Sequence, residues 1–148
     1  MHITLINSSK KRMPRKFIRA WCADMIIVLK RKKLKFVKES ELTIVFLDIG
    51  EAKKLNLRYR NKDYATDVLS FNGNKEMGQI GELIICPDVI VRQAREHKLL
   101  FRQELGYMIL HGILHLLGFD HEGSKKEAIE MFKIQDQSFD QLCRKFWA

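Results

Sequence analysis

Three of the five histidines in this chain, His111, His115 and His121, lie in one short apolar stretch, HGILHLLGFDH. A neutral imidazole in apolar surroundings needs a hydrogen-bond partner for each ring nitrogen that would otherwise bond to water. A shared metal ion would meet that need for all three rings at once. The simpler alternative is that two core histidines and one surface histidine are neighbours without a common ligand.

The spacing of these histidines suits a helix that ends close to the third one. Apolar residues recur at helical intervals over residues 101–117, so we predict a helix there. His111 and His115 would lie one turn apart on one face, with their Cβ atoms about 6 Å apart. Gly118 can adopt the left-handed conformation that ends a helix and lets the chain bring His121 back. We therefore predict that the three histidines bind one metal ion.

The chemistry of the ligand set favours zinc. Three imidazoles without a nearby thiolate suit a single Zn²⁺ ion, although nickel or copper can occupy the same set in a preparation. Three protein ligands leave one position for water, whose pKa zinc lowers to about 7, so we expect a hydrolytic site. Zinc proteases with the H-E-x-x-H motif carry a general-base glutamate directly after the first histidine, where this chain has Gly112. A zincin-like metalloprotease is therefore the alternative rather than the leading function.

Three carboxylates are close enough in sequence to orient these histidines. Asp120 and Glu122 flank His121, and Glu104 lies seven residues before His111 on the same helical face. A carboxylate that accepts a hydrogen bond from a ligand histidine fixes the tautomer of its ring. Each of the three acids could instead form a surface ion pair.

The remaining sequence predicts strands that alternate with helices in one domain over residues 1–148. We expect strands at 2–7, 41–48, 68–71 and 81–86, and helices at 14–29, 51–57, 87–97, 101–117 and from about 125 to 146. Residues 58–67 are polar and predict an irregular connection, and Gln135 falls on the apolar face of the last helix. These elements imply an α/β or α+β fold, with a small mixed sheet packed by helices and the metal-binding helix near the C-terminus.

The charge of the chain favours an anionic partner. The formal net charge is +9, and twelve Lys or Arg residues lie between Lys10 and Lys38, against the single acid Asp24. Such an excess is typical of proteins that bind nucleic acid. Three widely separated cysteines argue against a disulfide framework, and the apolar run at 25–29 is too short to span a membrane. We therefore expect a cytoplasmic protein with no membrane partner.

Two motifs together carry a family resemblance. The segment from Tyr59 to Phe71 has the form Y-R-x-K-D-x-x-T-D-V-L-S-F, and the segment from His111 to His121 has the form H-G-x-L-H-L-x-G-x-D-H. With both motifs the sequence strongly resembles the YbeY family of bacterial endoribonucleases over nearly the whole chain. The resemblance implies a zincin-like domain with zinc on the three histidines. It also implies a metal-dependent hydrolase that cuts single-stranded RNA.

The resemblance further implies a role in maturation of the 3′ end of 16S ribosomal RNA and in ribosome quality control. The implied partners are the small ribosomal subunit and its RNA, with a ribosomal protein or a GTPase as further partners. A non-catalytic RNA- or ribosome-binding module with a structural metal is the alternative from outside the enzymes. RNA that is bound but never cut would favour that alternative.

The family arginine thought to matter for activity falls on Arg60. A guanidinium can pair with a phosphate through two hydrogen bonds and stabilise charge that develops on it. Arg60 could instead form an ion pair with Asp63 or Asp67 that holds the loop. Arg58 and Lys62 are then expected to bind the RNA backbone.

Two positions depart from the family pattern. Glu82 stands where many members carry aspartate, and a role as general base or in positioning water is the catalytic expectation for it. Tyr107 stands where several members carry another histidine. We expect that a contact to the metal site is either lost there or replaced by the phenol.

Overall fold

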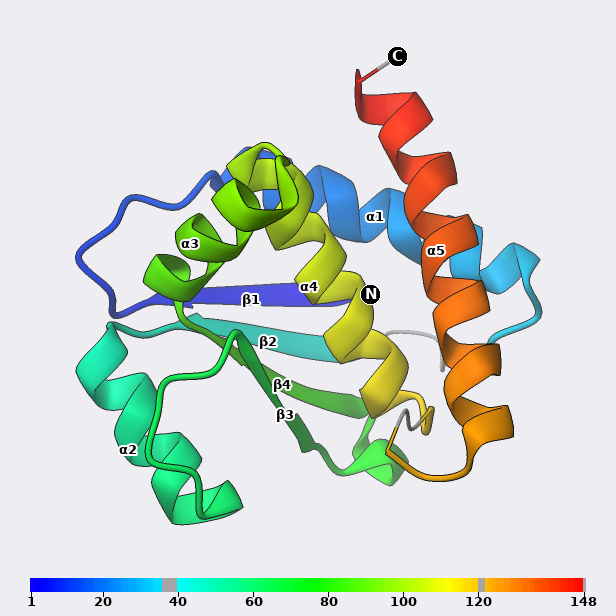
Figure 1. Cartoon of the computed structure of the whole chain (residues 1–148). Coiled ribbons are helices and arrows are strands. Elements are labelled where there is room, and N and C mark those ends of the chain that lie inside the picture. Colours follow the sequence, from blue (N-terminus) through cyan, green and yellow to red (C-terminus); the bar gives the residue numbers. More distant parts are fainter. Residues whose placement is uncertain (36–39, 120–121, 148) are drawn as a thin grey trace.

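A mixed four-stranded sheet forms the centre of the computed structural model, which describes residues 1–35, 40–119 and 122–147 (Figure 1). The elements follow one another as β1 (His2–Asn7), α1 (Arg15–Arg31), β2 (Glu41–Phe46), α2 (Ile49–Arg60), β3 (Val68–Asn72), a 3₁₀ turn (Lys75–Met77), β4 (Gln79–Ile85), α3 (Pro87–His97), α4 (Phe101–Leu116) and α5 (Lys125–Trp147).

The strand order in the sheet is β1-β2-β4-β3. β1, β2 and β4 run parallel, and β3 is the antiparallel strand at one edge, paired only with β4. Parallel neighbours need a crossover, which α1 supplies between β1 and β2. The predicted mixed sheet is confirmed, and the chain forms a single small α+β domain.

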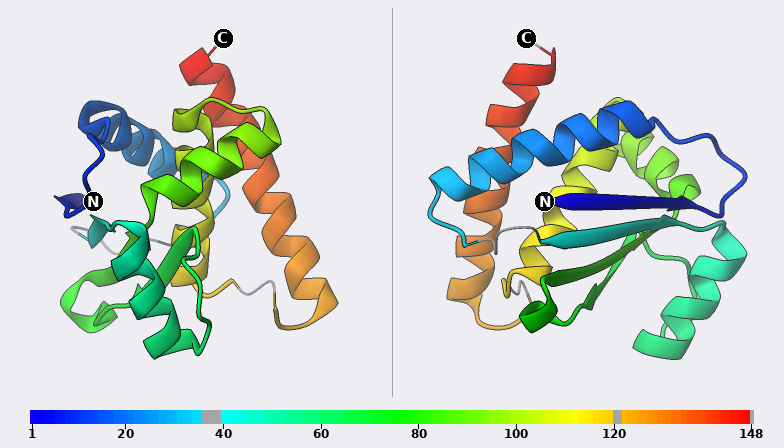
Figure 2. Two further views of the ribbon diagram at one scale, coloured as in Figure 1. Left: turned by 60° about the vertical axis from the view of Figure 1, so that its left-hand side comes forward. Right: turned by 180° about the vertical axis from the view of Figure 1, so that it is seen from behind.

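Helices α1, α3 and α4 lie on the same side of the sheet, and α5 packs outside α1 and α4 (Figures 1 and 2). Side chains from alternate strand positions point into this helical layer and are fully buried, among them Ile44 and Leu83. Trp21 from α1 is also fully buried, and its indole N–H donates to the Gly106 carbonyl of α4 at 3.0 Å. The core therefore fixes α4 between the sheet and the outer helices.

Helix α4 approaches β4 closely because two glycines face the contact. A Cβ atom on Gly112 would lie 2.6 Å from Leu83 Cδ2, and one on Gly81 would lie 2.8 Å from Leu116 Cδ2. Carbon atoms in contact normally stand about 3.5–4.0 Å apart, so larger residues would push the helix away from the strand. This close contact fixes the C-terminal half of α4, which carries His111 and His115, above the β3–β4 edge.

The main error in the predicted elements concerns α2, which was expected to end at residue 57 and continues to Arg60. The helix ends at Asn61, which adopts the left-handed conformation with φ = 57°. Asparagine tolerates that conformation better than most residues, so it can end a helix as glycine does. Arg58 and Arg60 consequently lie in the last turn of a helix rather than in an irregular loop.

The other predicted elements occur within a few residues of their expected bounds. Gly118 has φ = 99° and follows the end of α4, as the sequence predicts. In the described part of the chain, no helix is both long and apolar enough to cross a membrane.

Candidate functional site

The site centres on the last turns of α4, where His111 and His115 face each other. Their Nε2 atoms lie 3.0 Å apart, and both side chains are partly exposed. They open into a cleft of about 550 Å³ between the end of α4, the end of α2 with its following loop, and β3. Four further described residues of that cleft carry charged side chains: Arg60, Lys62, Asp67 and Glu122.

Gln135 on α5 fixes one of these rings. Its Oε1 lies 2.8 Å from His111 Nδ1, and its side chain is fully buried. An amide oxygen can only accept, so this contact places a proton on Nδ1 and leaves Nε2 with its lone pair toward the cleft. The sequence signal for this residue is a single amide on the apolar face of the last helix.

The two described histidines fit a metal ion. Two nitrogens that each lie about 2.1 Å from a tetrahedral zinc are about 3.4 Å apart, close to the observed Nε2–Nε2 distance of 3.0 Å. Among the residues that the structure describes, no group of three or more His, Cys, Asp or Glu forms a metal-binding cluster. The predicted third ligand, His121, and its neighbour Asp120 lie outside the described residues.

The chain turns sharply after the second histidine. The Gly118 N–H donates to the His115 carbonyl at 3.0 Å, and the Phe119 N–H donates to the Leu114 carbonyl at 3.0 Å. Lys75, from the turn between β3 and β4, donates to the Leu116 carbonyl at 2.8 Å. The ammonium group thereby satisfies an end carbonyl of α4, where the helix dipole favours a cation.

Arg60 and Lys62 bring positive charge into the cleft. The two acids considered as ion-pair partners of Arg60 are engaged elsewhere, because Asp63 pairs with Lys53 at 3.6 Å and Asp67 accepts from the Val68 N–H and from Gln93. In the described residues, no ion pair forms on Arg60. Its guanidinium is exposed and remains available to an anion.

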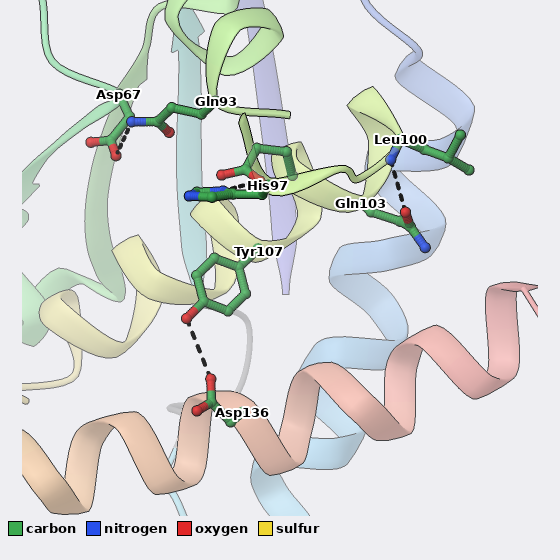
Figure 3. A network of polar contacts seen from close by, with 8 residues as sticks. Asp67, Gln93, His97, Leu100, Gln103, Tyr107 and Asp136 are labelled. Atoms are coloured by element: carbon green, nitrogen blue, oxygen red, sulfur yellow. Dashed lines mark hydrogen bonds and ion pairs between the residues drawn. The ribbon is translucent and has the colours of Figure 1, made fainter. Parts of the chain in front are cut away.

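Asp67 anchors the start of β3 beside the cleft. One carboxylate oxygen accepts from the Val68 N–H at 2.7 Å, and the other accepts from Gln93 Nε2 on α3 at 3.1 Å (Figure 3). Asn56 on α2 is buried and donates to the Tyr64 carbonyl at 2.7 Å, so it ties the connecting loop to the helix. These bonds tie the loop after Arg60 to α2 and the start of β3 to α3.

Two residues predicted to act in the site lie elsewhere. Glu82 does not line the histidine cleft, because strand alternation turns it to the opposite face of β4 from Gly81, beside Thr43 and Phe71. Arg58 does not line the histidine cleft either. It lies two positions before Arg60 on α2, so the two side chains point about 200° apart around the helix, and the Arg58 guanidinium lies 5.5 Å from the Tyr59 ring centroid. The expected catalytic role of Glu82 and the expected substrate contact of Arg58 therefore have no geometric support.

Gly112 has a packing role. The space where its side chain would stand is occupied by Leu83, so this position faces the sheet rather than the cleft. The general base of the H-E-x-x-H proteases has no counterpart here. This arrangement disfavours the metalloprotease alternative on geometry as well as on sequence.

Glu104 pairs with His97 instead of orienting a ligand histidine. Its carboxylate is fully buried, and its Oε2 lies 2.9 Å from His97 Nδ1 at the end of α3. This hydrogen bond, reinforced by the negative charge of Glu104, raises the pKa of His97. The Tyr107 hydroxyl donates to Asp136 on α5 at 3.3 Å (Figure 3).

Comparison with known proteins identifies the family. The model of the family described as Endoribonuclease YbeY matches residues 4–143. The chain belongs to the YbeY family. A relative from Bdellovibrio bacteriovorus, named Endoribonuclease YbeY, is 52% identical over 98% of this chain and 97% of its own length. A relative of the same name from Malacoplasma penetrans is 41% identical over 81% of this chain and 85% of its own length.

The fold is also similar to a solved structure. The solution structure of TM1509 from Thermotoga maritima matches with a TM-score of 0.67 and 28% identity over 97% of this chain and 91% of that chain. In the present chain, both motifs that carry the YbeY resemblance converge on one cleft. The helical motif supplies His111 and His115, and the other motif supplies Arg60 and Lys62.

The pair of His97 and Glu104 predicts a pH-dependent contribution to stability. Because folding raises the pKa of His97, the pair stabilises the fold fully below the ordinary histidine pKa of about 6.5, and this contribution is lost as the pH rises through the folded-state pKa. We expect Glu104→Gln to lower the pKa of His97, measured by NMR titration. The difference in free energy of unfolding between wild type and variant should shrink as the pH rises through the folded-state pKa of His97.

The matched control is Glu96→Gln, because Glu96 also raises the pKa of His97 but is an exposed neighbour that pairs with Arg92. It should lower the pKa of His97 less than the change at Glu104 does. An unaltered pKa of His97 in Glu104→Gln would show that the buried carboxylate is not its partner.

Proposed function

We propose that this chain is a zinc-dependent endoribonuclease that cuts single-stranded RNA. The observation that carries the proposal is the facing pair of His111 and His115 Nε2 atoms in the same cleft as the exposed guanidinium of Arg60. Membership of a family whose relatives are named endoribonucleases supports RNA as the substrate. The net charge of +9 supports it as well.

One zinc ion is proposed on His111, His115 and His121. A zinc ion with three protein ligands supplies Lewis acidity and lowers the pKa of water, which is the chemistry that phosphodiester hydrolysis needs at neutral pH. Gln135 holds the imidazole of His111 in the tautomer that ligation requires. Because Gln135 is buried, its hydrogen bond keeps the imidazole ring of His111 from turning.

Arg60 is proposed to bind the scissile phosphate. Its guanidinium can donate two hydrogen bonds to the non-bridging oxygens and stabilise the negative charge that grows on them. Lys62 adds a second positive charge for a neighbouring phosphate. The products identify the nucleophile, because a 2′,3′-cyclic phosphate end requires attack by the RNA 2′-hydroxyl and excludes direct attack by water as the first step.

We further propose a cytoplasmic role in maturation of the 3′ end of 16S ribosomal RNA and in ribosome quality control. The small ribosomal subunit, a ribosomal protein and a GTPase are the proposed partners. The support for this role is the family membership of the chain together with its basic surface.

The function is tested by cleavage of a single-stranded fragment of 16S ribosomal RNA, with metal content measured on each protein. We expect His115→Ala to lose metal and cleavage, because the facing nitrogen pair is broken. Arg60→Ala should keep its metal while kcat/KM falls by about 10² to 10³, the usual cost of removing a donor to developing charge.

Arg58→Ala is the matched control, since it removes the same side chain from the same helix outside the cleft. It should retain kcat/KM within about threefold, in line with the small effect of an exposed charge. Circular dichroism establishes that each variant is folded. A folded, metal-loaded wild type that binds the RNA without cutting it would refute the nuclease and favour a binding module with a structural metal.

The contact of Gln135 with His111 predicts a loss of metal affinity without a loss of fold. Gln135→Leu keeps the size of the side chain and removes the acceptor, so we expect zinc to bind about 10- to 100-fold more weakly. Gln135→Glu restores an acceptor oxygen and should recover most of the affinity. Competition with a chromogenic chelator measures these constants independently of activity.

Gln137→Leu makes the same substitution on the same helix, where the side chain is exposed and contacts Lys32. Zinc affinity should stay at the wild-type value in this control. Equal affinity in Gln135→Leu and wild type would mean that the amide is only a packing group.

A further inference from the structure

A second concentration of positive charge lies at the opposite end of α4 from the histidine cleft. Arg12, Arg15 and Lys16, around the start of α1, and Arg102, near the start of α4, line a shallow hollow of about 910 Å³. No acidic side chain lines this hollow among the described residues. We call these four residues the α1–α4 basic surface.

The placement of these charges runs against helix electrostatics. The N-terminal end of a helix is the positive end of its dipole, which favours acids and disfavours cations. The first turn of α1 contains no acid and begins with Arg15 and Lys16, and no side chain caps it. Arg102 is the second residue of α4, whose first turn also contains the buried acid Glu104.

The other cluster of cations on α1 has a structural explanation. Lys30 and Arg31 lie in the last turn, where positive charge complements the negative end of the dipole. The α1–α4 basic surface has no such explanation within the fold. Local rules are broken in this way mainly where function requires it.

The cationic groups of this surface are exposed and not neutralised by acids. No ion pair forms on Arg12, Lys16 or Arg102 in the described part of the chain, and Arg15 contacts only the Leu5 carbonyl, at 3.4 Å. The Arg102 guanidinium lies 5.7 Å from the Phe17 ring centroid, which holds it at the rim of the hollow. The surface is therefore preformed for an anion with several negative charges.

We infer that the α1–α4 basic surface binds backbone phosphates of the RNA outside the segment held in the histidine cleft. This inference rests on the proposed function, which supplies RNA as the polyanion. On α4, Arg102 lies nine residues before His111 and thirteen before His115, a separation of roughly 14 to 20 Å along the helix at about 1.5 Å per residue. One RNA strand that contacts both surfaces gains affinity, since the second contact forms at a high effective concentration.

The test measures binding of fluorescent single-stranded RNA of about 20 nucleotides, longer than a typical single binding site of 4–16 nucleotides. Fluorescence anisotropy is recorded at several salt concentrations, with a chelator present so that no cleavage occurs. The variant carries Arg12→Gln, Lys16→Gln and Arg102→Gln. The matched control carries Lys30→Gln, Arg31→Gln and Lys35→Gln, which remove three exposed charges at the other end of α1 and just after it.

We expect the variant to bind RNA at least about tenfold more weakly and its salt slope to fall by about two, because three phosphate contacts on a single strand contribute about 0.7 each. The control has the same net charge as the variant, and its affinity for RNA should differ from that of the wild type by less than about threefold. An equal loss of RNA affinity in the variant and in the control would show that only the overall charge matters, and it would overturn the inference. The inference is also overturned if the variant binds RNA as tightly as the wild type does. The same holds if the substitutions weaken binding to anionic lipid vesicles but not to RNA.

The result is separable from that of the proposed function. Binding in the presence of a chelator does not depend on the metal or on catalysis. A protein that binds RNA through this surface but does not cut it would refute only the nuclease. If the wild type cuts RNA and the variant binds RNA as well as the control does, only the second binding surface is refuted.

Discussion

The close packing of α4 on β4 is the constraint on which the site depends. Gly112 and Gly81 leave out the side chains that would separate helix and strand, and Leu83 and Leu116 fill the space instead. The buried positions of α4 fix the rotation of the helix, so the two ligand histidines point to the edge of the sheet where β3 and the end of α2 form the other wall. α5 then completes the arrangement, because Gln135 reaches His111 from outside the helix.

The electrostatics of the cleft follow from which acids are already paired. Asp63 pairs with Lys53, and Asp67 is held by backbone and amide donors, so neither neutralises Arg60. An exposed guanidinium without an internal ion pair costs the folded protein little free energy. It pairs strongly with a phosphate that enters the cleft. The segment from Arg60 to Asp67 therefore combines paired acids with an available cation, which suits recognition of an anion better than stabilisation of the fold.

Much of the fold could be predicted from sequence, because alternating strand patterns and helical periodicity directly reflect burial. The helical spacing of His111 and His115 and the end of the helix at Gly118 were predictable for the same reason. The end of α2 was missed because the left-handed conformation of Asn61 leaves a weak signal. The strand order was beyond prediction, since pairing depends on contacts between distant segments.

The errors in the site have the same origin. Glu82 was expected to act in the site because it stands at the acidic position of the YbeY family pattern, yet sequence alone does not reveal which face of its strand meets α4. Gln135 was visible as an amide on an apolar face, but its partner is decided only by how α5 packs on α4. Glu104 shares the helical face of His111, and its carboxylate is instead taken up by His97 from a different helix.

The most direct test of the account is the crystal structure of the zinc-loaded protein, with anomalous scattering measured on both sides of the zinc absorption edge. The account predicts one strong peak about 2.1 Å from Nε2 of both His111 and His115, with Gln135 Oε1 still bonded to His111 Nδ1. A peak at another site, or coordination of the ion through Nδ1 of His111, would contradict it.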